Sequence, residues 1–172
     1  MIVLRCTRKL ASRLTLTPGA EDLQPTARLG DWYAGVLNVG HQRFVHCVSE
    51  KSLLSVVLPA RDVRQLPSRV PGAVASLLTR LGVPAAVVEA EVSAMLPVCV
   101  GLTRSRSVVG SLVELGREAA FRLSPGAPPT ADVELALAAV PCLKLEPDAM
   151  PFRTAAALLG VRVANPEWRV LH

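Results

Sequence analysis

The sequence has few aromatic residues and no long apolar run. Phe, Trp and Tyr make up 3% of its 172 residues, so a hydrophobic core must be built mainly from Val, Leu and Ala. No stretch approaches the ~18 consecutive apolar residues of a membrane-spanning helix. The apolar run near the N-terminus is also shorter than the ~7–15 residues of a secretory signal. We therefore expect a cytoplasmic protein without a membrane partner.

Cysteine is sparse, and no two cysteines have the C-x-x-C spacing of a metal or redox motif. The four residues, each in an apolar or strand-like setting, are Cys6, Cys47, Cys99 and Cys142. We expect core thiols in a reducing compartment rather than disulfides. His41, His46 and Cys47 are close in sequence, but adjacent residues on a strand point to opposite faces. We therefore predict no metal site, and no motif implies a cofactor.

Hydrophobic residues make up 51% of the chain, enough for one compact domain over 1–172. The formal net charge of +5 permits association with polyanions without implying it. Segment 5–13 contains four basic residues and no acid. On a helix, Arg5, Lys9 and Arg13 would share one stripe that could contact phosphates or simply face solvent.

The pattern of apolar residues predicts an α+β fold. Apolar, β-rich segments predict strands at 2–6, 32–39, 43–49, 53–59 and 98–103. Helical spacing predicts helices at 7–14, 71–81, 83–96, 105–123, 131–140 and 152–160. Short connections indicate an antiparallel meander over 32–59, hence a mainly antiparallel sheet of four or five strands. Helices mostly from the C-terminal half would pack on it, with the Pro-rich segment 124–129 preceding a small helical part at 130–160.

Four segments, in order, resemble one uncharacterised bacterial family known as a domain of unknown function. They are RCTRKL (5–10), RLGDWYAGVL (28–37), TRSRSVVGSL (103–112) and VPCLKLEPDAMPFRTAAALLG (140–160). Members of that family carry R-C-T-K-K-L, L-G-D-W-Y-A-N and N-S-R-S-V-L-G-S-M. This chain has Gly35 and Arg104 where the family has Asn, and Leu112 where Met is usual.

The resemblance implies no established activity, so it transfers no catalytic residues. Some similar proteins are associated with plasmid or insertion-element passenger proteins. The resemblance therefore implies a link to mobile elements or defence.

The segment GLTRSRSVVGSLVE (101–114) is the first candidate site. A strand that runs into a helix leaves free N–H groups at the helix start, which favour anions. The candidate anion-binding residues here are Arg104, Ser105, Arg106, Ser107 and Ser111. The alternative is structural: Ser105 or Ser107 caps the helix, Ser111 and Glu114 have capping-box spacing, and Gly110 allows close packing.

The segment LGDWYAG (29–35) is the second candidate. Trp32 and Tyr33 could stack on a base or sugar, although such residues more often close a core edge. Asp31 is a candidate for a catalytic acid or base, and a turn cap or a pair with Arg28 is the structural alternative.

The leading hypothesis is a binding module for an anionic partner, either nucleic acid or a nucleotide, whose binding residues lie in segment 104–111. The first alternative is a small phosphate-ester-processing or toxin-like enzyme, with Asp31 as acid or base and Arg106 stabilising negative charge. The second is a protein–protein accessory subunit with an exposed apolar face. The sequence does not determine the ligand or the oligomeric state.

Overall fold

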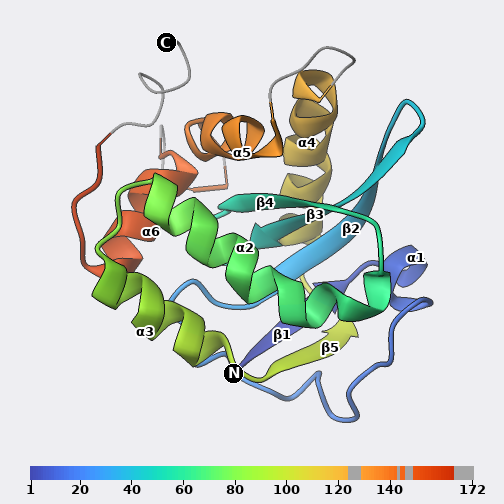
Figure 1. The fold of residues 1–172 in the computed structure, drawn as a ribbon. Coiled ribbons are helices and arrows are strands. Elements are labelled where there is room, and N and C mark those ends of the chain that lie inside the picture. The colour runs from blue at the N-terminus through green and yellow to red at the C-terminus, as the bar shows by residue number, and fades with distance from the viewer. Residues whose placement is uncertain (124–128, 143, 146–148, 165–172) are drawn as a thin grey trace.

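Five strands form one sheet in the computed structural model, which describes residues 1–123, 129–142, 144–145 and 149–164. The strands are β1 (Ile2–Cys6), β2 (Trp32–Val39), β3 (Gln42–Ser49), β4 (Ser55–Pro59) and β5 (Val98–Leu102). Their order across the sheet is β4-β3-β2-β1-β5 (Figure 1). The α+β class and all five predicted strands are confirmed.

The sheet is mostly antiparallel, as predicted, but it is mixed rather than a pure meander. Strands β2, β3 and β4 do form an antiparallel meander, as their short connections predict. Strand β1, however, pairs in parallel with both β2 and β5. Parallel neighbours need a long connection that returns the chain to the same end of the sheet. Segment 7–31 connects β1 to its parallel neighbour β2, and segment 60–97 carries the chain from edge strand β4 to β5 beside β1. The length of these two segments was the sequence feature that could have indicated parallel pairing.

The helices cover both faces of the sheet. They are α1 (Arg8–Ala11), the 3₁₀ turn η1 (Val63–Gln65), α2 (Leu66–Arg80), α3 (Ala85–Met95), α4 (Arg106–Arg122), α5 (Thr130–Ala138) and α6 (Pro151–Leu159). Helix α2 lies on one face, followed by α3, and α4 lies on the other (Figure 1). Helix α2 starts earlier than predicted, because Pro67 occupies its first turn and Pro71 is inside it. Gly82, with φ at +85°, follows its end as predicted.

Strand β3 separates two hydrophobic clusters. Val45 and Cys47 pack with α2 and α3, whereas Phe44 and Val48 pack with α4 and α5. This alternation is the one that the sequence predicts for 43–49. His46 therefore lies on the α4 face and Cys47 on the other face. Within the described residues, no group of metal-ligating side chains comes together.

The four cysteines, all within the described residues, are free. Cys6 and Cys47 are buried, as expected, while Cys99 and Cys142 are only half-buried. Burial raises the pKa of the Cys6 thiol to about 12. A thiol held in the protonated form is a poor nucleophile, so Cys6 serves as a core residue.

Helix α5 protects the outer edge of the sheet. The Glu134 carboxylate accepts a hydrogen bond from the Val57 N–H of edge strand β4 at 2.7 Å, and it also pairs with Arg80. Covering an edge strand in this way blocks unwanted strand addition. Helices α5 and α6 contribute side chains to the same hydrophobic clusters as the sheet. The expected Pro-rich loop lies outside the described residues except for Pro129, the N-cap of α5.

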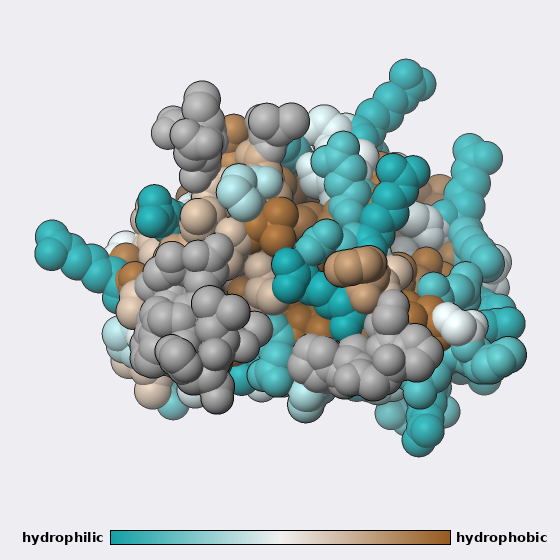
Figure 2. Space-filling view, turned by 90° about the horizontal axis from the view of Figure 1, so that it is seen from above, coloured by the Kyte–Doolittle hydropathy of each residue, from teal (hydrophilic) through white to brown (hydrophobic). Residues whose placement is uncertain are grey.

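Figure 2 shows the molecule from above, with long hydrophilic side chains projecting at the periphery and hydrophobic residues in the middle. The exposed large hydrophobic residues of the described chain come from several separate elements. They are Leu16, Leu96, Leu102, Val113 and Phe121. No helix among the described residues combines the length and the apolar character needed to cross a membrane.

Candidate functional site

The start of α4 is capped by a serine. The Ser105 hydroxyl accepts a hydrogen bond from the Val108 N–H at 3.3 Å, and the Ser105 N–H donates to the Tyr33 hydroxyl at 3.3 Å. The structural alternative for Ser105 is therefore confirmed. Because α4 begins at Arg106, Ser111 lies inside the helix, where its hydroxyl donates to the Ser107 carbonyl. Ser111 and Glu114 do not form the capping box that their spacing suggested.

Beneath this helix start lies a set of charged and polar side chains that we call the arginine–carboxylate cluster: Arg5, Asp31, Tyr33, Glu50 and Arg104. Asp31 is fully buried and accepts hydrogen bonds from the Val3 N–H at 2.8 Å and from Arg5 Nε at 2.9 Å. A buried carboxylate is stable only when it is paired and hydrogen-bonded. These two donors meet that requirement.

Arg104 closes the cluster from the solvent side. Its Nη2 lies 3.5 Å from Asp31 Oδ2 and 3.7 Å from Glu50 Oε1, and its side chain is 38% exposed. The Tyr33 hydroxyl donates to Glu50 Oε1 at 3.4 Å. Burial and the Glu50 charge raise the pKa of Tyr33, while the Ser105 backbone and Arg104 oppose the shift. The charge of Arg104 is thus shared by two carboxylates instead of facing solvent unpaired.

The structure brings together only some of the predicted site residues. Asp31, Tyr33, Arg104 and Ser105 meet in or at the cluster. Trp32 is fully buried on the opposite face of the sheet, among the residues that pack with α2. Trp32 and Tyr33 therefore do not form one stacking platform, because adjacent strand residues alternate.

Arg106 and Ser107 are exposed in the first turn of α4. Their predicted contact with an anion stays a prediction. Gly110 is also exposed and has open space around its Cα, so it does not provide the close packing considered for it. The enzyme hypothesis needed Asp31 close to Arg106, but the arginines that pair with Asp31 are Arg5 and Arg104. With two donors already bound to it, Asp31 has the environment of a structural residue.

Two members of the cluster were missed from the sequence. Arg5 lies in strand β1, as the strand predicted at 2–6 requires, and is 1% exposed. The basic stripe considered for a helix therefore does not include Arg5, because α1 begins only at Arg8. Glu50, directly after β3, carried no motif. Only the register of β2 with β3 places Glu50 in the cluster. Trp32 pairs with Ser49, so the next residues outward, Asp31 and Glu50, lie side by side.

A second group of cations lies around the β2–β3 hairpin and the end of β4. We call this group the basic hairpin surface, and it consists of Lys9, Arg13, Arg43, Arg61 and Arg64. All five side chains are exposed. Within the described part of the chain, none of them forms an ion pair.

Three adjoining hollows hold these cations. The first, of about 430 Å³, is lined by Lys9, Arg13 and Arg43. The second, of about 750 Å³, shares Arg43 and adds Arg61. The third, of about 650 Å³, shares Arg13 with the first and adds Arg64, and Asp62 is the acidic residue that lines it. Shared lining residues connect the hollows, so the cations form one surface.

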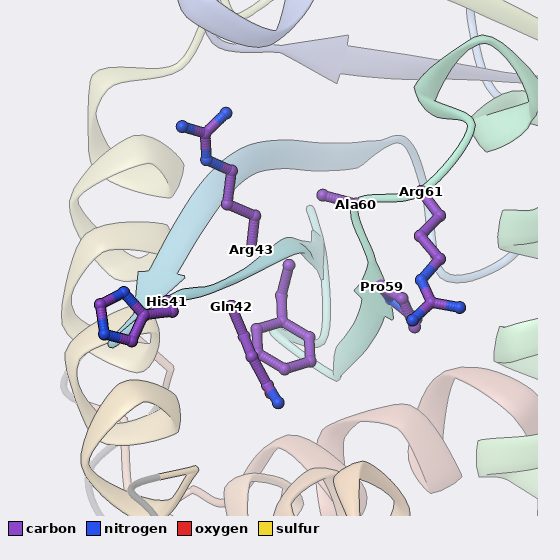
Figure 3. A pocket seen from close by; sticks show the side chains of 7 residues that line it. His41, Gln42, Arg43, Pro59, Ala60 and Arg61 are labelled. Carbon is purple, nitrogen blue, oxygen red and sulfur yellow. The ribbon is translucent and has the colours of Figure 1, made fainter.

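Backbone contacts fix the segments that carry these cations. The Ala60 N–H donates to the Arg43 carbonyl at 2.9 Å, which holds the end of β4 against the start of β3. Arg69 of α2 donates through Nη1 to the Arg61 carbonyl at 2.7 Å and to the Pro59 carbonyl at 3.2 Å. Figure 3 shows Arg43 and Arg61 on facing segments, with their guanidinium groups extending to different sides of the second hollow.

Comparison with known proteins gives one match. A family model described as a domain of unknown function, DUF6933, matches residues 3–150. That range includes both the arginine–carboxylate cluster and the basic hairpin surface. No match to this chain was found among curated proteins or among solved structures.

Proposed function

The chain belongs to the DUF6933 family, and we propose that it is a binding module for a nucleic acid, whose phosphates are held by the basic hairpin surface. One observation carries this proposal: five exposed cations line connected hollows, and none of them is ion-paired within the described residues. Exposed cations without counter-charges on one lined surface create a positive potential that attracts polyanions.

The layout of the cations favours an extended anion over a small one. Lys9 and Arg13 come from the α1 region, Arg43 from β3, and Arg61 and Arg64 from the segment after β4. A single phosphate would contact only one of the three hollows. A phosphate backbone can contact several of them at once, and each contact releases condensed counterions. Arginine also binds phosphate through two parallel N–H groups.

The arginine–carboxylate cluster supports this function without contacting the ligand. It fixes the start of α4 against β1 and β2 through Arg104, Tyr33 and the Ser105 cap. Arg106 and Ser107 keep their predicted role as additional contacts at the exposed start of α4.

The test is a pair of triple variants with equal net charge. One carries R13Q, R43Q and R61Q on the basic hairpin surface. The control carries R122Q, R153Q and R162Q, which remove arginines of α4, α6 and the segment after α6. Each variant lowers the formal net charge of +5 by three. Binding to a fluorescein-labelled 20-nucleotide DNA single strand is measured by fluorescence anisotropy over a range of NaCl concentrations.

We expect the surface variant to lose at least tenfold in affinity, and its slope of log K against log salt to flatten by about 2, since each lost contact contributes about 0.7 for a single strand. The control variant should keep most of the affinity and most of the slope. Equal losses in the two variants would indicate an effect of net charge alone. That result, or no binding by the unmodified protein at low salt, contradicts the proposal.

A further inference from the structure

A small pocket opens beside the basic hairpin surface, between α4 and strands β2 and β3. Its volume is about 300 Å³, at the lower end of the range for ligand pockets. Its walls are mainly apolar and include Val36, Leu37 and Leu112.

Two glycines line this pocket, Gly35 of β2 and Gly116 of α4. A Cβ atom at Gly35 would lie 3.4 Å from Leu112 Cδ2, and one at Gly116 would lie 3.5 Å from His46 Nδ1. A larger side chain at either position would occupy space in the pocket. The pocket therefore depends on the absence of side chains at these two positions.

His46 forms part of the pocket wall and is 2% exposed. Neither ring nitrogen has a hydrogen-bond partner within the described residues. Burial lowers the pKa of His46 to about 4, and the Leu112 backbone opposes that shift without meeting the geometry of a hydrogen bond. A neutral imidazole presents one donor and one acceptor. Buried polar atoms normally have partners, so these two unpartnered nitrogens suit a hydrogen-bonding ligand. Both are themselves buried, so a ligand meets them only when the pocket wall shifts to admit it.

The rim of the pocket carries the cations Lys9 and Arg117, both exposed. Lys9 and Val36 also line the first hollow of the basic hairpin surface, beside Arg13 and Arg43. A group seated in the pocket would therefore have a cation at its mouth and further cations next to it.

We propose that this pocket takes one unstacked nucleobase, with its own phosphate at Lys9. Apolar walls suit the faces of a base, a donor and an acceptor suit its edge, and a cation at the rim suits the phosphate. The base comes from a single strand or from a free nucleotide, because a base stacked in a duplex cannot reach the pocket. This inference rests on the proposed phosphate-binding function, which it extends to base recognition.

The experiment compares three labelled probes of equal length: a DNA single strand, the matching duplex, and an abasic strand that has the phosphates without the bases. Two protein variants are used. H46L removes both ring nitrogens and leaves an apolar side chain in the pocket wall, and G116V fills the pocket from the α4 side. Urea unfolding of each variant identifies any loss of folding. Because the two substitutions come from different elements, one folded variant is sufficient for the test.

We expect the unmodified protein to bind the single strand about tenfold more tightly than the duplex or the abasic strand. Each folded pocket variant should lose this preference and keep its affinity for the abasic strand. Equal binding of all three probes, or a preference that survives in a folded pocket variant, overturns the base pocket while leaving phosphate binding intact. Failure to bind any probe instead overturns the proposed function as well.

A competition experiment separates the two sources of the base. Adenosine and cytidine monophosphates are added to the complex with the single strand. If the nucleotides displace the single strand from the unmodified protein but not from H46L, a free nucleotide is sufficient to fill the pocket. If they displace nothing, and the preference for the single strand over the abasic strand still depends on His46, the pocket takes a base only from a single strand. Both results support the pocket. Equal displacement from the unmodified protein and from H46L counts against it.

Discussion

The arginine–carboxylate cluster and the basic hairpin surface both depend on arginine, but they use it in opposite ways. In the cluster, the guanidinium groups of Arg5 and Arg104 lie against Asp31 and Glu50. On the surface, Lys9, Arg13, Arg43, Arg61 and Arg64 have no carboxylate partner within the described residues. The first arrangement stabilises the fold, and the second leaves charge available for a ligand.

This difference shows that the position of an arginine in a motif is a poor guide to its role. Arg104 lies in a segment typical of an anion site, yet its charge is shared between two carboxylates. Arg43 and Arg61 lie in no motif, and the fold brings them to the same hollow. A carboxylate within reach of the guanidinium is what separates the two roles.

The largest effect is expected from breaking the cluster at its buried centre. The variant D31A removes the partner of Arg5 and the acceptor of the Val3 N–H, leaving a buried cation unpaired. We expect a loss of about 3–5 kcal/mol in the free energy of unfolding, measured by urea denaturation. R43Q on the basic hairpin surface should change it by less than about 0.5 kcal/mol.

The double variant R5M/D31A provides the control for this prediction. Removing both charges leaves no unpaired buried ion, so it should recover part of the stability lost in D31A. If D31A costs less than about 1 kcal/mol, Asp31 does not hold the cluster together, and the comparison between the two regions fails.

A smaller effect is expected from the buried imidazole next to the basic hairpin surface. The pKa of His46 is lowered from 6.5 to about 4 by burial. The unfolded chain therefore binds a proton more readily than the folded one between these values, and stability falls as the pH drops through this window. Between pH 7 and pH 5 this group should remove about 2 kcal/mol from the free energy of unfolding.

Urea denaturation at the two pH values measures this loss, and H46L serves as the reference because it cannot titrate at this position. The unmodified protein should lose about 2 kcal/mol more than H46L on acidification. If both proteins lose the same amount, the charge state of His46 is not linked to folding.

The smallest effect is expected at the helix start above the cluster. S105A removes the side-chain acceptor of the Val108 N–H and should cost about 1 kcal/mol. S107A, an exposed position in the first turn of the same helix, serves as the matched control and should change stability by less than about 0.5 kcal/mol. Thermal or urea denaturation distinguishes the two, and equal effects would argue against Ser105 as the cap.

Much of the fold could be predicted from local patterns, because strands and helices follow from apolar spacing. The alternation of Val45 and Cys47 with Phe44 and Val48 is a local property and was predicted. The parallel pairing of β1 was not, since it depends on which distant strands become neighbours.

The candidate site was less predictable, for the same reason. Asp31 and Arg5 meet only because β1 and β2 pair, so the sequence alone did not join them. The separation of Trp32 from Tyr33, by contrast, follows from the strand predicted at 32–39, whose alternation places neighbours on opposite faces. The basic hairpin surface needs the tertiary placement of α1, β3 and η1, which no local pattern specifies.

The central claim is that the ligand meets the unpaired cations and not the paired ones. Arginine Nε–H resonances of the isotope-labelled protein, recorded by NMR during titration with a DNA single strand, test this claim directly. We predict that the resonances of Arg13, Arg43, Arg61 and Arg64 shift together and saturate with one dissociation constant, while that of Arg5 stays unchanged. Shifts confined to Arg104 and Arg106 at the start of α4, or no shifts in any arginine, would contradict the account.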